Sequence, residues 1–132
     1  MSTTVPSTRS AVERSRPAPV TPVVLDAAAL ESTAPDYLRE VADELRKRDR
    51  VAVGLRVEAS FNEAASLAVQ AEADRVRTYV RAASYLGVDT VTVTVDAVAD
   101  EELVRPTIEA CAERARRDGL AFDVDGPAAL EP

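Results

Sequence analysis

The chain has 132 residues, 46% of them apolar and 30% charged, which is typical of one soluble globular domain that forms its core without disulfides or structural metals. It contains one cysteine and no histidine, so it has no internal disulfide and lacks both the usual general base of enzymes and the commonest neutral metal ligand. Its 16 basic and 23 acidic residues give a formal net charge of -7, which argues against nucleic acid as a partner.

Residues 1 to 18 are rich in Ser, Thr, Arg and Pro without helical or strand periodicity, so we expect a flexible N-terminal arm. The arm lacks the apolar region of a signal peptide, and no apolar run in the chain has the length that crosses a bilayer. We therefore expect a cytoplasmic protein that binds no membrane. One α/β domain is predicted over residues 19 to 126, followed by a C-terminal tail over residues 127 to 132.

The first predicted strand runs from Val20 to Asp26 and contains Pro22, which suits an edge strand. A helix is predicted from Pro35 to near Asp49, because proline fits the first turn of a helix and the apolar residues after it recur at helical spacing.

The second predicted strand, residues 51 to 59, has two unlike faces. One face carries Val51, Val53, Leu55 and Val57. The other face carries Ala52, Gly54, Arg56 and Glu58. Ser60 and Glu63 then have the spacing of a capping box, so we expect a long helix to begin at Ser60.

That long helix is predicted to end at Gly87, a residue suited to a left-handed helix stop. Its inward stripe consists of Val69, Val76, Val80, Ala83 and Leu86. The third strand covers residues 91 to 96, where valines alternate with Thr92, Thr94 and Asp96.

The last predicted helix ends at Gly119 and has Val104, Ile108, Cys111 and Ala115 on its inward face. Pro106 predicts a kink or break near Arg105, because its ring meets the carbonyl four residues earlier. Cys111 is expected to be a buried core thiol. Residues 120 to 125 alternate as the fourth strand, with Ala121 and Asp123 on the polar side.

Strands and helices alternate with a repeat of about 30 residues, the length of a βαβ unit. The sequence therefore predicts an α/β fold with a four-stranded, mainly parallel sheet and three helices on one face, a half-barrel-like (βα)3β arrangement. Every second strand residue is small or polar, which indicates that no helix covers the other face.

The segment from Arg77 to Val88, which ends in a small-residue pair and Leu-Gly before the strand at Val91 to Asp96, resembles the xylose isomerase-like barrel superfamily of sugar phosphate isomerases and epimerases. Ile108 to Asp125 resembles the next helix and strand of that family, and the similarity covers residues 51 to 125. The resemblance implies a barrel that holds a divalent metal and a sugar substrate at the carboxyl ends of its strands. A complete barrel has about 250 residues and eight strands, so this chain corresponds to half of one.

Three carboxylates, Glu58, Asp96 and Asp125, are predicted at the carboxyl ends of strands and on the face away from the helices. Without histidine, such a set suits Mg²⁺, Mn²⁺ or Ca²⁺ better than zinc. The alternative is that an acidic protein places carboxylates at solvated strand ends without binding metal.

Arg56 lies on the same predicted face, where it either clamps a substrate phosphate or carboxylate or forms an ion pair with Asp96 or Asp123. Gly54 allows either close approach of a ligand or a bulge. Ser60 at the predicted helix start could bind an anion, although Glu63 already places negative charge there.

Two functions follow. One is a diverged sugar or sugar-phosphate binding protein, isomerase-like or epimerase-like; the other is a noncatalytic α/β interaction module that uses the polar sheet face. We also expect a two-fold homodimer, because half a barrel leaves a sheet face and strand edges unpaired. Lys47 is the only lysine, and the acidic composition fits either a salt-adapted archaeon or a high-GC bacterium.

Overall fold

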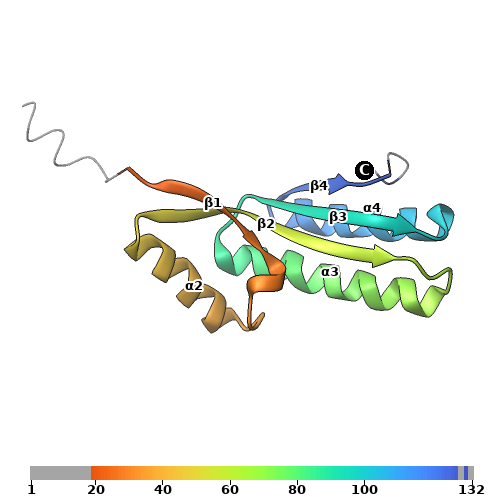
Figure 1. Ribbon diagram of the computed structural model, residues 1–132, viewed down its shortest axis with the longest axis horizontal. Coiled ribbons are helices and arrows are strands. Elements are labelled where there is room, and N and C mark those ends of the chain that lie inside the picture. Colours follow the sequence, from red (N-terminus) through yellow and green to blue (C-terminus); the bar gives the residue numbers. More distant parts are fainter. Residues whose placement is uncertain (1–18, 128–129, 131–132) are drawn as a thin grey trace, which may run out of the picture.

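The computed structural model describes residues 19–127 and residue 130, and in this part of the chain strands alternate with helices (Figure 1). The elements are β1 (Thr21–Asp26), the short 3-10 helix η1 (Ala27–Ala29), α2 (Pro35–Lys47), β2 (Arg50–Phe61), α3 (Ser66–Leu86), β3 (Thr90–Val98), α4 (Glu101–Arg117) and β4 (Ala121–Asp125). The strands form one sheet in the order β1-β2-β3-β4, and each neighbouring pair is parallel. The predicted α/β fold is confirmed, and the predicted N-terminal arm lies outside the described residues.

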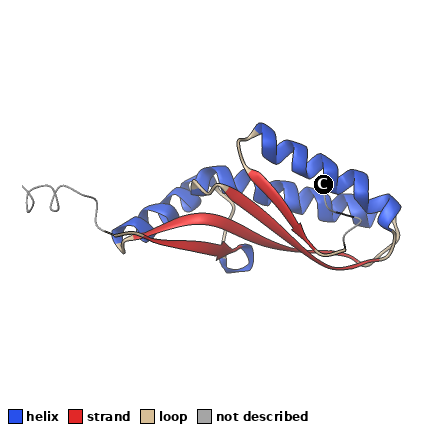
Figure 2. Cartoon of the chain, turned by 90° about the horizontal axis from the view of Figure 1, so that it is seen from above, coloured by secondary structure: helices blue, strands red, loops and turns tan. Residues whose placement is uncertain are grey.

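The three α-helices lie on one side of the sheet, and no α-helix of the described chain covers the other side (Figure 2). Helix α3 packs on β2 and against α4, while α4 packs on β4 and α2 packs on β2. The arrangement matches the layout expected for right-handed crossovers between parallel strands.

The core lies between the helices and the sheet. The predicted inward residues of α3 and α4 are buried, and Val76, Ile108 and Cys111 are 0% exposed. The valines of β3 at positions 91, 93 and 95 are buried as well, as their alternation predicts. Leu130, which the sequence places in the C-terminal tail, is 1% exposed and belongs to this core.

Both predicted helix stops are present. Gly87 ends α3 with a φ of 75° and Gly119 follows α4 with a φ of 78°, the left-handed conformation that glycine adopts without strain.

The amino-terminal half of β2 differs from the predicted alternation. Val23 of β1 pairs with Ala52, but Val24 pairs with Gly54, so β2 contains one extra residue, Val53, at a bulge. The bulge reverses the phase of the strand, and Ala52 is a core residue, 5% exposed. The prediction that Ala52 lies on the uncovered face is therefore wrong, whereas Gly54 does lie in a bulge.

The prediction that a helix begins at Ser60 is also wrong. Strand β2 continues to Phe61, and α3 begins only at Ser66 after Ala65. Phe61 continues the inward alternation of β2 and is 2% exposed, so its burial keeps the first two residues of the expected capping box, Ser60 and Phe61, in the strand. Ser60 consequently lies at a strand end and not at a helix N-terminus.

The expected break near Arg105 does not occur, because α4 is one helix through Pro106. Only five residues of α4, about one and a half turns, lie before the proline. The Asp100 carboxylate holds the first turn by accepting the backbone N–H groups of Glu102 at 3.1 Å and Leu103 at 3.2 Å.

Candidate functional site

The side of the sheet that the α-helices leave bare is here called the open face. Side-chain alternation and strand register place on it Val24 and Asp26 of β1, Val51, Gly54, Arg56, Glu58 and Ser60 of β2, Thr90, Thr92, Thr94 and Asp96 of β3, and Ala121, Asp123 and Asp125 of β4.

The open face is divided along the strands. Its amino-terminal part is apolar, and Val24 is 64% exposed and Val51 is 37% exposed. Val20, directly before β1, is 46% exposed. Its carboxyl-terminal part is strongly acidic and carries a single basic side chain, that of Arg56. The carboxylates there belong to Asp26, Glu58, Asp96, Asp123 and Asp125.

Two of the predicted metal ligands lie in one row across the sheet. Glu58 pairs with Thr94, and Thr94 pairs with Asp125. Because neighbouring strands are about 4.8 Å apart, the backbones of the two acidic residues are separated by roughly 10 Å. Asp96 lies two residues further along β3, outside this row. The structure therefore spreads the three carboxylates over the open face.

The described residues do not fit a metal ion, since they contain no group of three or more His, Cys, Asp or Glu side chains placed to hold one. Between Glu58 and Asp125, the Thr94 hydroxyl oxygen is shielded from solvent and has no hydrogen-bond partner in the described chain.

Arg56 lies in the neighbouring row, between Asp26 of β1 and Thr92 of β3, with Asp123 one strand further. Its side chain is exposed. Within residues 19–127 and 130 it forms no ion pair, with Asp96, with Asp123 or with any other group. The ion-pair alternative from the sequence is therefore not realised.

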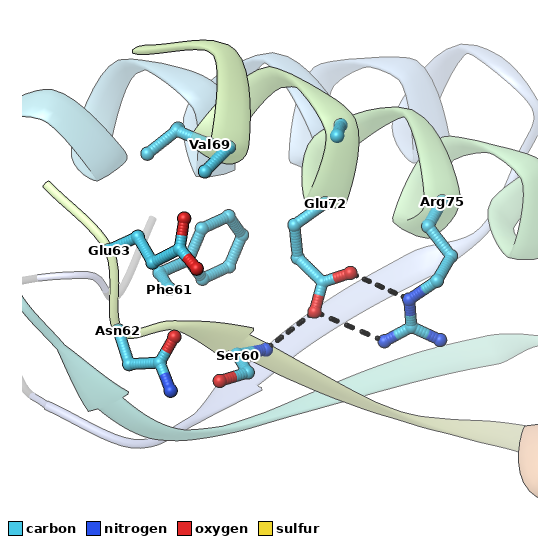
Figure 3. A pocket seen from close by; sticks show the side chains of 9 residues that line it. Ser60, Phe61, Asn62, Glu63, Val69, Glu72 and Arg75 are labelled. Atoms are coloured by element: carbon cyan, nitrogen blue, oxygen red, sulfur yellow. Dashed lines mark hydrogen bonds and ion pairs between the residues drawn. The ribbon is translucent and has the colours of Figure 1, made fainter. Parts of the chain in front are cut away.

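Ser60 lies beside a pocket of about 440 Å³ between the end of β2 and the start of α3 (Figure 3). The pocket is lined by Ser60, Phe61, Asn62, Glu63, Ala68, Val69, Ala71, Glu72 and Arg75. Its position is explained by strand lengths, because β1 ends at Asp26 opposite Arg56 while β2 continues to Phe61 without a β1 partner.

Glu72 and Arg75 of α3 bond to the part of β2 that extends past β1. The Ser60 backbone N–H donates to Glu72 Oε2 at 2.7 Å, and an Arg75 N–H donates to the backbone carbonyl of Glu58. Arg75 Nε also donates to Glu72 Oε1 at 2.6 Å (Figure 3). These two side chains thus occupy backbone groups that a neighbouring strand would otherwise bind.

The electrostatics of this pair follow from its contacts. Burial alone would raise the pKa of Glu72, but the hydrogen bonds from Arg75 and Ser60 and the Arg75 charge outweigh burial and lower that pKa. The hydrogen bond to Glu72 raises the pKa of Arg75. Glu72 and Arg75 therefore both stay charged at neutral pH.

Sequence reasoning missed Glu72 and Arg75. Their spacing of three residues predicts a surface ion pair on a helix, which is common. The pair caps β2 only because β2 is longer than β1 and extends past its end. The residues of β2 alone do not indicate which part of the strand lacks a partner strand.

Comparison with known proteins identifies a family for this chain, but the description of that family states no activity. The family model that matches the chain covers residues 19–124 and carries the description "Domain of unknown function (DUF8564)". No curated protein and no solved structure matches the chain. Among the described residues, none of the helices has the length and apolar character needed to cross a membrane.

Proposed function

Since the chain belongs to the DUF8564 family, whose function is unknown, its role must be inferred from its geometry, and we propose that it is a noncatalytic interaction module that binds a partner protein through the open face. The single observation that carries the proposal is a parallel sheet whose α-helices all lie on one side. Parallel sheets are almost always covered on both faces. A partner supplies the missing cover.

The surface of the open face supports this role. Exposed apolar side chains lie at the β1 and β2 side of the sheet, those of Val20, Val24 and Val51. Large apolar side chains gathered on a surface mark interaction sites. The acidic carboxyl-terminal half selects a partner of opposite charge. The partner therefore presents basic side chains next to apolar ones.

Besides covering the open face, the partner pairs with the edge strand β4, which borders that face. The β1 edge carries Pro22, which donates no backbone hydrogen bond, and the extension of β2 is capped by Glu72 and Arg75. Beside β4 no further strand of the described chain pairs. An extended partner segment can add there as a strand, with backbone hydrogen bonds giving affinity and side chains giving specificity.

The side chains of β4 define the sequence of that segment. Asp123 and Asp125 are exposed on the open face, while Phe122 and Val124 are partly buried on the helix side. A strand that alternates basic and apolar residues would place its cations beside the two carboxylates and its apolar residues beside Phe122 and Val124. The proposed ligand is therefore an extended segment that alternates Lys or Arg with Val, Ile or Leu.

Anisotropy of a fluorescent peptide that alternates valine and lysine tests this proposal. We expect salt-sensitive binding to the wild type, and an affinity reduced several-fold, up to about tenfold, in the Asp123→Asn/Asp125→Asn double variant. The matched control is Glu40→Gln/Glu109→Gln, which removes the same charge from exposed positions on the helices. Equal losses in both variants, or no binding to the wild type, would contradict the proposal.

A second copy of the chain is the alternative occupant that the homodimer prediction implies. Pairing two β4 strands brings Asp123 and Asp125 of each copy towards the same residues of the other, and like charges across strands are destabilising. We therefore expect a monomer in light scattering at low salt. A dimer that forms above about 0.1 M salt, where charges are screened, would favour the second copy over a basic partner.

The exposed side chain of Arg56 supports a second candidate function, the sugar-phosphate binding that the resemblance to xylose isomerase-like proteins implies. Its unpaired guanidinium matches a phosphate group, and Glu58 beside it can accept hydrogen bonds from sugar hydroxyls. Titration of ¹⁵N-labelled protein with glucose 6-phosphate tests this candidate, which predicts amide shifts on β2 that Arg56→Gln abolishes. Metal analysis of the purified protein is a second discriminator, because stoichiometric Mn²⁺ or Mg²⁺ would favour the sugar-phosphate function.

A further inference from the structure

A second polar pocket lies between α3 and α4. It has a volume of about 350 Å³ and is lined by Asp74, Arg77, Thr78, Arg81 and Arg114. The four residues of α3 occupy positions i, i+3, i+4 and i+7, which places them on one face of that helix, towards Arg114 of α4.

This pocket is basic although the chain as a whole has a formal charge of -7. Three guanidinium groups line it, against the carboxylate of Asp74 in the lining and that of Asp118, which contacts Arg114, so the arginines are in excess by one charge. Gathering like charges costs free energy in the absence of a counterion, and the cost falls when an anion binds among them. Three arginines from two helices therefore form an arrangement that an anion would stabilise.

The internal partners of these arginines leave binding capacity free. Arg77 pairs with Asp74, and Arg114 contacts Asp118 at 3.5 Å, the longest ion pair described in the chain. Arg81 is exposed and has no hydrogen bond or ion pair with the described residues. Each guanidinium has five N–H donors in a planar fork, so one carboxylate contact leaves several donors for a ligand.

Arg77 lies near a neutral thiol. Its side chain is 34% exposed, and Cys111 is fully buried in the core. Burial raises the pKa of Cys111, and the nearby Arg77 charge only partly opposes that rise. The thiol therefore stays neutral and does not compete with an anion for the guanidinium of Arg77.

From this geometry we propose that the α3–α4 pocket is a binding site for a small phosphate monoester, whose phosphate is held by Arg77, Arg81 and Arg114. Guanidinium forks match the oxygens of a phosphate group and bind them in bidentate fashion. The volume lies near the lower end of the range for small-molecule sites, which leaves space for a short organic portion beside the phosphate.

The test is a titration of the full chain, labelled with ¹⁵N, with inorganic phosphate and separately with glycerol 3-phosphate. We expect both to shift the amide signals of residues 74 to 81 and of residues near 114, with tighter binding of the monoester. Equal affinities for inorganic phosphate and glycerol 3-phosphate would mean that the pocket recognises the phosphate group alone, and would contradict the proposal that its ligand is a monoester. No shift at the pocket with either ligand would overturn the proposal as a whole.

Two matched variants separate this site from general electrostatics. Arg81→Gln removes an arginine without an internal partner, so it should fold normally and bind phosphate about tenfold more weakly or worse. Arg116→Gln removes the same charge from an exposed position of α4 outside the pocket and should bind as the wild type does. An equal loss in both variants would contradict a defined site.

Arg56→Gln distinguishes this pocket from the open face. If the α3–α4 pocket binds the monoester, the amide shifts at α3 persist in Arg56→Gln. If the shifts instead occur on β2 and vanish in that variant, the phosphate site lies on the open face and the present proposal fails. The interaction module does not depend on either result.

Discussion

The carboxylate of Glu72, in the middle of α3, accepts the backbone N–H of Ser60 at 2.7 Å, near the end of β2. A helix side chain thus binds a group that a neighbouring strand would bind in a longer sheet. Together with the Arg75 bond to the Glu58 carbonyl, this contact closes the β2 overhang against strand addition. The edge that remains open to a partner is therefore β4.

Replacing Glu72 by Gln should destabilise the protein by about 1–2 kcal/mol at pH 7, because charge-assisted hydrogen bonds are lost at a partly buried side chain. Since the folded-state pKa of Glu72 lies below its ordinary value, its stabilising effect is complete above the unfolded pKa. It is lost as the pH falls through the lower folded-state pKa. Urea unfolding across pH should therefore show the wild-type advantage shrinking below about pH 4.

A suitable control for that experiment is Glu44→Gln. Glu44 forms an ion pair of the same spacing with Lys47, but both side chains are mostly exposed. Removing it should change stability by less than about 1 kcal/mol. If Glu72→Gln changes the free energy of unfolding no more than this control at every pH, the hydrogen bond to Ser60 does not stabilise the protein.

Gly126 should be sensitive to substitution, because a Cβ there would lie 2.8 Å from the backbone carbonyl oxygen of Val95. Gly126→Ala should lower the free energy of unfolding by about 1–3 kcal/mol. Gly54→Ala is the matched control, since its Cβ would meet the side chain of Val24 at 3.5 Å, an ordinary contact. We expect that change to be neutral or stabilising by less than about 1 kcal/mol, and thermal melting compares the two.

Thr94→Val removes the shielded hydroxyl that has no hydrogen-bond partner in the described chain. The nearly isosteric valine avoids an unpaired buried polar group, so stability should be unchanged or rise by about 1 kcal/mol. Thr92→Val, one row away on the same strand, is the comparison. A clear loss of stability in Thr94→Val alone would indicate that its hydroxyl has a partner in solution.

Val76→Asp on α3 and Ile108→Asp on α4 should each unfold the domain, because both side chains are 0% exposed and a buried unpaired carboxylate costs several kcal/mol. A domain of this kind has only about 5–15 kcal/mol of stability. Val24→Asp, at a valine that is 64% exposed, should melt close to the wild type. Circular dichroism melting checks all three, and near-wild-type melting of both core variants would refute the assigned packing.

The elements that the sequence predicted correctly are those in which local pattern and burial agree. The valines of β3 alternate strictly and are buried as expected, and Gly87 and Gly119 stop their helices because few other residues adopt a positive φ. In β2 the pattern failed because a bulge at Val53 changes the phase, and a bulge depends on pairing with β1.

The candidate site was predicted only in part. Arg56, Glu58 and Asp125 lie on the uncovered face, as alternation predicts, but whether Arg56 finds a carboxylate depends on distances across strands that one sequence does not contain. Ser60 shows the same limit: the capping-box spacing is local, whereas Phe61 belongs to the core and keeps the chain extended. Contacts between distant segments decided both cases.

The most direct test of the interaction module is a map of where the alternating valine and lysine peptide binds. In ¹⁵N-labelled protein the account predicts amide shifts confined to β4 and the adjacent part of β3, with protection of β4 backbone amides from hydrogen exchange. Shifts confined to the helices, or a peptide that binds without protecting β4, would contradict the claim that the open edge of the sheet receives the partner.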